Sequence, residues 1–339
     1  MIQTTDNALS VDHIQQGIVY KKTLGKYYVR ANDRVLISSI SNKLRKQLVY
    51  PIADPSSLRR RVMEVKDIDE VDPVAVGDVV TFVDAGDGSG LITEIQPRKN
   101  KLSRPSSDGA RRMKKSQPLE QVLVANIDQI VIVMPAANPA PSWDLLDRYL
   151  ATAEAAHLPA VICLTKIDLM TGDDLTREIE VYHQIDYPVI MTSAVTGENI
   201  DQVKAALKDR VSVLWGKSGV GKTSLLNAIQ PGLGLRVKEV NAHNSEGRHA
   251  TSHVEMFDFE FGGSVIDTPG QRKFKLWDDD ITDFAQLLPE MRPFIGQCKF
   301  GVGCSHTREP GCAIKAAVAA GKISQRRYDS LLGMKEYFG

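Results

Sequence analysis

The chain has 339 residues, a length that predicts about two or three domains. Lys and Arg together number 42, as do Asp and Glu, and 42% of the residues are hydrophobic, which excludes a wholly disordered or fibrous protein. The longest apolar runs are shorter than the roughly 18 residues of a transmembrane helix, and the N-terminus lacks the basic and apolar segments of a signal peptide. Four cysteines are too few for a disulfide scaffold and favour a reducing, cytoplasmic compartment.

The zero net charge hides an uneven distribution along the chain. Residues 1–120 contain 20 Lys and Arg against 15 Asp and Glu, and residues 292–339 contain 8 against 3. Residues 121–291 contain 14 against 24. Basic ends favour a polyanionic partner such as nucleic acid, although ordinary surface solubility explains the same charges.

The N-terminal third shows a β pattern. Residues 1–16 are polar, and we expect a frayed, flexible N-terminus. Residues 17–97 contain five short β-like runs separated by Gly and Asp clusters, without a long helical period. This pattern predicts an OB-like β-barrel, a fold that often binds nucleic acid, although other small barrels would produce a similar pattern.

A basic segment follows at residues 98–118. It is rich in Pro, Ser and Gly and has no apolar face to bury, so we interpret it as a loop. A solvated linker is one interpretation, but we favour an arm that contacts RNA phosphates. The candidate RNA-binding residues are Arg98, Lys99, Lys101, Arg104, Arg111, Arg112, Lys114 and Lys115.

Residues 119–288 alternate between strands and helices. The run 128–134 ends in five consecutive apolar residues, as expected for a buried parallel strand. A helix is expected after Ser142, a residue type favoured at N-caps, and others near 173–185 and 199–208. The alternation predicts a doubly wound α/β domain, and residues 289–339 form a last, mostly helical domain.

A phosphate-binding motif lies between the strand-like run 211–215 and a helix. The spacing G-x-x-x-x-G-K-[ST] predicts a P-loop whose backbone N–H groups surround phosphate oxygens. Lys222 is expected to reach the β- and γ-phosphates, and Thr223 to ligate Mg²⁺. The predicted nucleotide-binding residues are Gly216, Lys217, Ser218, Gly219, Val220, Gly221, Lys222, Thr223 and Ser224.

Two further motifs fit the same nucleotide site. Asp267 and Gly270 are the first and last residues of the sequence Asp-Thr-Pro-Gly, which ends a strand. In P-loop NTPases an Asp at this place helps to hold Mg²⁺, and in GTPases the Gly N–H senses the γ-phosphate. Thr251 lies in the polar segment 241–253, where a switch threonine would complete the Mg²⁺ shell. The alternative for Thr251 is an ST-type turn at the start of a strand.

Guanine recognition is predicted upstream of the P-loop. Thr165, Lys166 and Asp168 form T-K-x-D after an apolar strand, similar to the guanine motif N-K-x-D. The Asp168 carboxylate would accept hydrogen bonds from both donors of guanine, a pair that adenine lacks. Ser193 and Ala194 end the next strand and resemble the element whose backbone contacts guanine O6. Because these motifs precede the P-loop, the domain is expected to be circularly permuted.

The C-terminal segment contains a cysteine and histidine cluster. Cys298, Cys304, His306 and Cys312 have the spacing C-x5-C-x-H-x5-C, which predicts one closed, structural zinc site. A disulfide would leave one thiol over and would not need the histidine. Cys163 lies in an apolar strand, and we expect it to be a core residue.

In this order, the motifs resemble those of the circularly permuted, ribosome-associated GTPases of the RsgA/YjeQ type, which are small ribosomal subunit biogenesis GTPases. The resemblance extends from about Gly17 to the C-terminus. It implies a cytoplasmic GTPase, stimulated by the small ribosomal subunit during its late maturation and released by hydrolysis. It also implies that the barrel and the zinc domain contact ribosomal RNA, and we expect a monomer.

The chain departs from the family pattern at three places. Thr165 replaces the more usual Asn, which suggests weaker guanine binding. The first zinc spacing is one residue longer than usual, and Gly301 and Gly303 make that extra residue easy to accommodate. Gln271 follows the Asp-Thr-Pro-Gly motif, where Ras-like enzymes orient water with a glutamine and this family usually has an apolar residue.

The catalytic candidates are therefore Gln271, His249 and Thr251. His249 is the rival of Gln271 for positioning the attacking water, and ribosomal RNA is a third possibility. Two other functions fit parts of the sequence. One is an RNA-binding assembly factor in which nucleotide only tunes affinity, and the other is an ATP-dependent P-loop enzyme, which Asp168 argues against.

Overall fold

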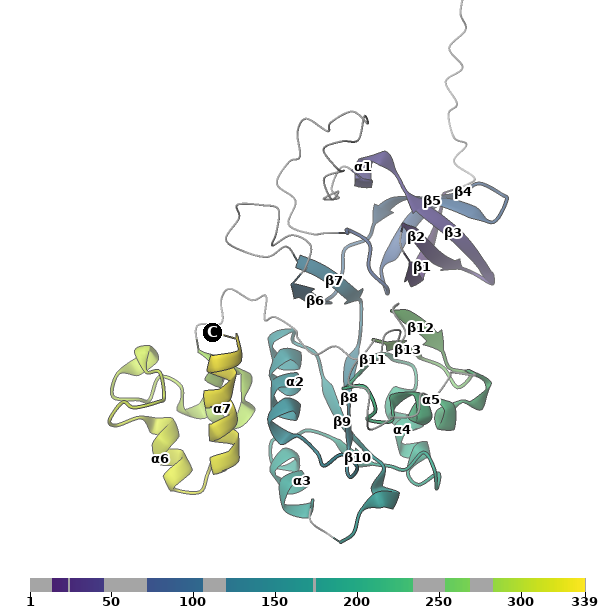
Figure 1. The fold of residues 1–339 in the computed structure, drawn as a ribbon. Helices are drawn as coiled ribbons and strands as arrows, with labels where there is room; N and C mark the ends of the chain where they lie inside the picture. The colour runs from purple at the N-terminus through teal and green to yellow at the C-terminus, as the bar shows by residue number, and fades with distance from the viewer. Residues whose placement is uncertain are drawn as a thin grey trace, which may run out of the picture. The chain divides into compact units, whose positions relative to one another are not determined.

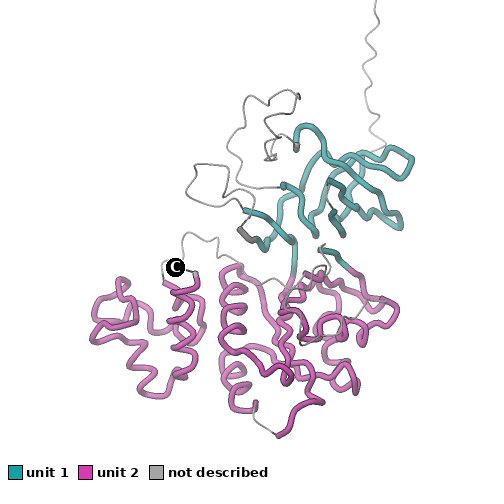
Figure 2. The backbone as a smooth tube through the Cα atoms, viewed as in Figure 1, with its two compact units in different colours: residues 1–127, 251–256 teal, residues 128–250, 257–339 magenta. Residues whose placement is uncertain are grey.

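The computed structural model describes residues 14–23, 25–45, 72–105, 120–172, 175–233, 254–268 and 283–338. These residues divide into two compact units (Figure 2). One comprises residues 1–127 and 251–256, and the other residues 128–250 and 257–339. None of the described helices is long and apolar enough to span a membrane.

The first unit contains a closed five-stranded barrel (Figure 1). Its strands are β1 (Ile14–Thr23), β2 (Lys26–Ala31), β3 (Arg34–Ile40), β4 (Val79–Asp84) and β5 (Ser89–Ile95). The order is β1-β2-β3-β5-β4, and β4 pairs again with β1 to close the barrel. Only the β3–β5 pairing among these is parallel. The predicted OB-like barrel is therefore confirmed.

The barrel interior is built by alternation along the strands. Val19, Val29, Phe82 and Ile92 are fully buried, and their neighbours in sequence face outward. A short helix, α1 (Asn42–Arg45), follows β3 and adds Leu44 to the core. The barrel begins at Ile14, three residues before the predicted boundary, because β1 pairs with β4 from its first residue.

The predicted basic loop is partly a strand. Residues of β6 (Lys101–Pro105) pair antiparallel with β7 (Glu120–Ala125). Leu102 lies opposite Val124 in this pairing and is 3% exposed, so the segment has a buried apolar side chain in spite of its basic composition. The loop interpretation was therefore wrong for residues 101–105, while residues 106–119 lie outside the described chain.

The second unit is built around a mostly parallel sheet in the order β10-β9-β8-β11-β13-β12. Its strands are β8 (Gln129–Pro135), β9 (Ala160–Thr165), β10 (Val189–Met191), β11 (Val211–Trp215), β13 (Ser264–Asp267) and the second half of β12 (Glu255–Asp258), whose residues 255–256 belong to the first unit. Strands β8 and β11 pair in parallel, with Ser212 opposite Gln129. This pairing joins the two halves of the predicted permuted domain within one sheet.

Helices cover both faces of this sheet (Figure 1). They are α2 (Trp143–Ala155), α3 (Thr176–His183), α4 (Ile200–Leu207) and α5 (Lys222–Ile229), with 3₁₀ turns η2 (Ile167–Leu169) and η3 (Pro231–Leu233). Leu214 packs toward α4 and α5, whereas the adjacent Trp215 stacks on Tyr149 of α2. Ser142 occupies the predicted N-cap position of α2, but its side chain makes no capping hydrogen bond.

The C-terminal module packs on α2 within the same unit. Its elements are η4 (Phe284–Leu287), η5 (Pro289–Phe294), η6 (Gly301–Gly303), α6 (Ala313–Ala319) and α7 (Gln325–Phe338). Ala285, Met291, Ile314 and Leu331 share one core with Ala151 of α2. Because η4 belongs to this core, the module begins about five residues before the predicted boundary at 289.

Candidate nucleotide-binding site and metal centre

The predicted P-loop lies between β11 and α5, as the motif requires. A Cβ at Gly216 would overlap the carbonyl oxygen of Val133, and Gly221 has φ +101°, so glycine is needed at both positions. Helix α5 begins at Lys222, which directs the first N–H groups of the helix at the loop. The loop therefore has the backbone that binds phosphate groups.

Lys222 and Asp267 influence each other electrostatically next to this loop. The Lys222 Nζ is buried and donates to the carbonyl oxygens of Gly216, at 2.7 Å, and Lys217, at 3.0 Å. Burial lowers the pKa of Lys222 and raises the pKa of Asp267, while each charge opposes the shift of the other. The Oδ1 of Asp267 is buried without a hydrogen-bond partner among the described residues. A buried carboxylate oxygen without a hydrogen-bond partner, on the strand that pairs with β11 before the P-loop, fits a hydrated Mg²⁺ ion, since oxygen ligands and water suit that metal.

Thr165 joins the guanine motif to the P-loop. Its Oγ1 is 2.5 Å from the carbonyl oxygen of Val220 and 3.2 Å from that of Met134. The residue is 2% exposed, so its hydroxyl links the end of β9 to the P-loop at Val220 and to β8 at Met134 in a site shielded from water. The hydroxyl thus connects the base-recognition motif to the phosphate-binding loop. This is the connection that we expected to be weaker with Thr than with the more usual Asn.

Lys166 and Asp168 border the same loop. Lys166 has φ +61°, and its Nζ donates to the carbonyl oxygens of Gly219, at 2.9 Å, and Asn138, at 2.6 Å. Its alkyl stem therefore runs beside the P-loop, as expected for the floor of a base pocket. Asp168 is exposed, and its Oδ1 accepts a hydrogen bond from Ser193 Oγ at 2.6 Å.

Ser193 holds the loop that carries Ala194. Its Oγ accepts from the backbone N–H groups of Val195, at 3.2 Å, and Thr196, at 3.1 Å, while it donates to Asp168. The hydroxyl therefore orients the carboxylate that is expected to read guanine. The sequence did not predict this use of the Ser193 side chain, nor the carbonyl oxygen of Asn138, because backbone acceptors leave no residue-type signal.

Several predicted residues lie outside the described chain. They are His249, Thr251, Gly270 and Gln271 in the switch segments and Arg111, Arg112, Lys114 and Lys115 in the basic segment. Lys99 is exposed, and Lys101 pairs with Glu120 at 2.7 Å.

Arg98 has a structural role within the barrel unit. Its guanidinium pairs with Asp78 at 2.7 Å and donates to the carbonyl oxygen of Pro73 at 2.6 Å. The side chains of Arg98 and Asp78 are 15% and 0% exposed. This charge is neutralised by a buried partner, so Arg98 is not available to pair with an RNA phosphate.

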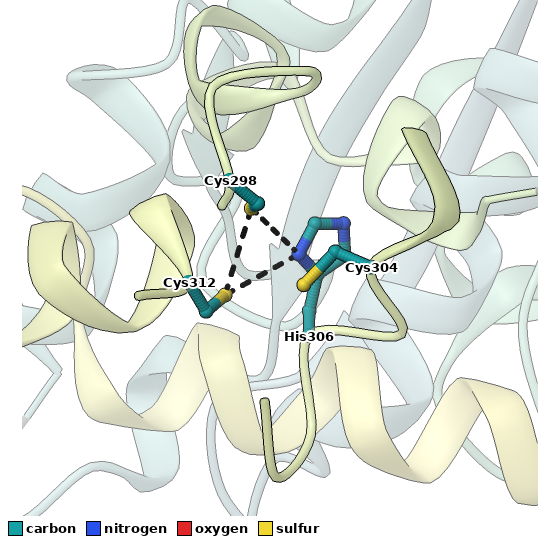
Figure 3. Close-up of side chains that lie close together, drawn as sticks. All are labelled: Cys298, Cys304, His306 and Cys312. Atoms are coloured by element: carbon teal, nitrogen blue, oxygen red, sulfur yellow. Dashed lines mark hydrogen bonds between the residues drawn. The ribbon is translucent and has the colours of Figure 1, made fainter. Parts of the chain in front are cut away.

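The four predicted zinc ligands converge in the C-terminal module (Figure 3). Their candidate ligand atoms all lie within 4.8 Å of one another, and all four residues are buried. His306 Nδ1 is 3.5 Å from Cys298 Sγ and 3.4 Å from Cys312 Sγ, and those two sulfurs are 3.8 Å apart. Three thiols and one imidazole at these separations fit tetrahedral zinc.

Cys163 stands apart from this cluster, as predicted. It is fully buried in β9, and burial raises the pKa of its thiol to about 12. A thiol with this pKa stays protonated at neutral pH and is unreactive.

Comparisons with known proteins identify relatives over most of the chain. The RsgA GTPase family model matches residues 95–277. A small ribosomal subunit biogenesis GTPase RsgA of Bacteroides fragilis is 36% identical over 325 residues, which cover 95% of this chain and 96% of that protein. The protein of the same name from Geobacillus kaustophilus is 35% identical over 317 residues, covering 93% and 94%.

Two solved structures share the fold over nearly the whole chain. YjeQ from Thermotoga maritima has a TM-score of 0.68 at 29% identity and covers 95% of this chain and 97% of its own. YloQ, described as a circularly permuted GTPase, has a TM-score of 0.64 at 30% identity and covers 98% and 96%. With the P-loop, the permuted strand order and the zinc cluster in place, the chain belongs to the RsgA GTPase family.

Proposed function

We propose that this protein hydrolyses GTP in a cycle of binding to the small ribosomal subunit and release from it during late subunit maturation. The observation that carries the GTPase assignment is the 2.5 Å hydrogen bond from Thr165 to Val220. It joins the guanine motif to the P-loop, although 55 residues separate them in the reverse of the usual order. Base and phosphates can therefore be bound by one continuous surface.

Different residues around the P-loop would bind the base, the phosphates and the metal ion. Asp168 and the loop at Ala194 would read guanine, while Lys222 and the N-terminus of α5 would neutralise the phosphates. Thr223 and Asp267, together with Thr251, would hold Mg²⁺, which neutralises charge on the β- and γ-phosphates when bound. Phosphoryl transfer needs orientation and charge neutralisation, and these residues provide both.

The attacking water needs a further positioning group. His249 and Gln271 remain the candidates, with ribosomal RNA as the third. Single-turnover hydrolysis on saturating small subunits should distinguish His249→Ala from Gln271→Ala. A tenfold loss, about 1.4 kcal/mol of barrier, in one variant with unchanged GTP affinity would identify the positioner. If both variants hydrolyse GTP normally, the ribosome supplies the group.

The partner proposal rests on the relatives, which are named for small ribosomal subunit biogenesis. Ribosomal RNA is the expected contact, and the barrel offers suitable chemistry. On the outward faces of β1 and β2, the Arg30 guanidinium lies 5.2 Å from the centre of the Tyr20 ring. The rings of Tyr20 and Tyr28 contact edge to face, with centres 6.2 Å apart. Aromatic rings beside cations are the side chains on which unpaired RNA bases stack. We further propose a monomer that acts in the cytoplasm.

GTP turnover with and without isolated small subunits tests the proposal. We expect slow turnover of the protein alone and a large increase on small subunits, with large subunits and ATP as controls. Equal affinity for ATP and GTP would contradict the guanine assignment. Absence of stimulation, with subunit binding intact, would favour an RNA-binding assembly factor in which nucleotide only tunes affinity.

The basic segment can be tested by salt dependence. Replacing Arg111, Arg112, Lys114 and Lys115 by Ala should flatten the salt dependence of subunit binding, by about three in log–log slope if each residue contacts one phosphate. The double variant Lys204→Ala/Lys208→Ala removes two charges from α4 and its C-cap, and should leave the slope unchanged. An unchanged slope in the fourfold variant would support the linker interpretation.

A further inference from the structure

The imidazole of His306 has a different partner on each side. Its Nδ1 faces the sulfurs of Cys298 and Cys312 at 3.5 and 3.4 Å. Its Nε2 lies 2.8 Å from Oδ2 of Asp283, outside the ligand cluster. The His306 and Asp283 side chains are 2% and 12% exposed, so this contact is largely shielded from water.

Asp283 also holds the beginning of the C-terminal module. Its Oδ1 accepts from the backbone N–H of Ala285 at 3.0 Å and caps η4. The residue therefore uses one oxygen on the backbone and the other on the candidate zinc ligand. Tyr328 completes the arrangement, because its hydroxyl donates to the carbonyl oxygen of His306 at 2.6 Å and restrains the backbone at that ligand.

We propose that Asp283 is an outer-sphere residue of the zinc site, which orients His306 for metal binding. The carboxylate accepts a hydrogen bond from Nε2–H and so selects the tautomer whose Nδ1 lone pair faces the sulfurs of Cys298 and Cys312. A carboxylate in this position also raises the basicity of the coordinating nitrogen. Asp283 lies 15 residues before the first cysteine, so the spacing of the ligands does not point to it.

The inference rests on the zinc proposal, and two measurements separate them. Zinc at one equivalent per chain in the wild-type protein tests the site itself. Zinc affinity, measured on the full chain by competition with a chromogenic chelator, tests Asp283. A chain without zinc would contradict the site, whereas a zinc-loaded chain with no dependence on Asp283 would contradict only the present inference.

Asp283→Ser separates the capping role from the metal role. The serine hydroxyl can still cap η4, since Ser is a favoured N-cap, but it is too short to reach His306. We expect zinc to bind about tenfold to a hundredfold more weakly, because loss of an outer-sphere carboxylate has this effect in other zinc sites. Asp329→Ser is the matched control, as Asp329 is an exposed carboxylate of α7 in the same module. Wild-type zinc affinity in Asp283→Ser would overturn the proposal.

A second background shows whether Asp283 acts through His306. In His306→Cys the fourth ligand has no imidazole to orient, so adding Asp283→Ser should cause no further loss of zinc affinity. An equal loss in both backgrounds would show that Asp283 acts through folding of the module, and would overturn the proposal. If Asp283→Ser fails to fold, Asp283→Asn in the same two backgrounds provides the comparison, because it removes the charge while keeping the size.

Discussion

At position 165, a threonine hydroxyl makes the contact to the P-loop for which the family more usually has an asparagine side chain. The sequence predicts a weaker guanine site because Thr165 has one donor where an amide is more usual. In the structure, that donor lies within reach of two buried carbonyl oxygens, at Val220 and Met134. A buried carbonyl that loses its donor is destabilised, so the position of the hydroxyl matters more than the number of donors.

Thr165→Val should therefore weaken GDP and GTP binding although the side-chain volume barely changes. The valine leaves the Val220 carbonyl without its partner, and we expect a loss of about 1–1.5 kcal/mol, or roughly five- to tenfold in affinity. Titration with a fluorescent GDP analogue measures the effect. Thr93→Val removes a hydroxyl from the barrel and serves as the control. Unchanged affinity in Thr165→Val would show that the tether is dispensable.

Asp168 is the residue expected to set base preference. Asp168→Asn replaces an acceptor oxygen by an amide donor, which opposes the exocyclic amine of guanine and matches the 2-oxo group of xanthine. We expect GDP affinity to fall and xanthosine diphosphate affinity to rise, as measured by competition for one labelled nucleotide. A variant that retains its preference for GDP would refute the role of Asp168.

At the scale of elements, a buried charge cluster fastens α7 to α2 and α3. Asp147 of α2 is fully buried and accepts from Arg327, at 2.6 Å, Arg326, at 2.8 Å, and Tyr182, at 2.7 Å. Burial raises the pKa of Tyr182 well above its ordinary value, with the Asp147 charge adding to the shift, so the phenol keeps its proton and donates. Arg327 also pairs with Glu290 of η5 at 2.6 Å. Through Asp147 and Arg327, the cluster thus connects four elements, namely α2, α3, α7 and η5.

Asp147→Ala should destabilise the second unit strongly, because it leaves buried guanidinium groups without their main partner. Removal of one member of a buried ion pair typically costs about 3–5 kcal/mol, and urea denaturation followed by tryptophan fluorescence would measure it here. Replacing the pair as Asp147→Leu/Arg327→Met should recover only part of the loss, because Arg326, Tyr182 and Glu290 would still lack these partners. The exposed pair of Asp201 and Lys204, 3.6 Å apart, is the control, and Asp201→Ala should cost less than about 1 kcal/mol.

At the scale of the whole molecule, the C-terminal module lies within the second compact unit, where it shares a core with α2. Its core includes Ala151 of α2, and its Arg292 forms an ion pair with Glu154. Three of the eight basic residues in 292–339, namely Arg292, Arg326 and Arg327, therefore neutralise acidic partners within the unit. The basic excess of this segment is weaker support for RNA binding than the sequence alone indicated.

Cys312→Ser should release the module from its metal without disrupting the nucleotide site. We expect zinc content to fall, residues 289–339 to become sensitive to proteolysis, and binding to the small subunit to weaken. GDP affinity should remain close to that of the wild type, because the P-loop and the guanine motif pack on other elements. Metal analysis, limited proteolysis, subunit binding and GDP titration test these outcomes. A wild-type protein without zinc would contradict the prediction, because it assumes a bound zinc ion.

The amino-acid sequence alone determined the features that depend on local pattern. The five barrel strands, the P-loop, the guanine motif, the permuted order and the four zinc ligands all follow from spacing and periodicity, which are properties of neighbouring residues. Even so, local composition misassigned β6, because this segment becomes a strand by pairing with β7, about twenty residues further along the chain.

Only the tertiary structure decided which charged and polar side chains are already paired. The sequence predicts Arg98 as an RNA contact, but in the structure its guanidinium pairs with Asp78. Arg327 pairs with Asp147, which lies 180 residues earlier in the sequence. Asp283 likewise reaches His306 from another element. A charged residue has the same sequence signal whether it faces solvent or a buried partner, and the difference between a binding surface and an internal ion pair arises only when the chain folds.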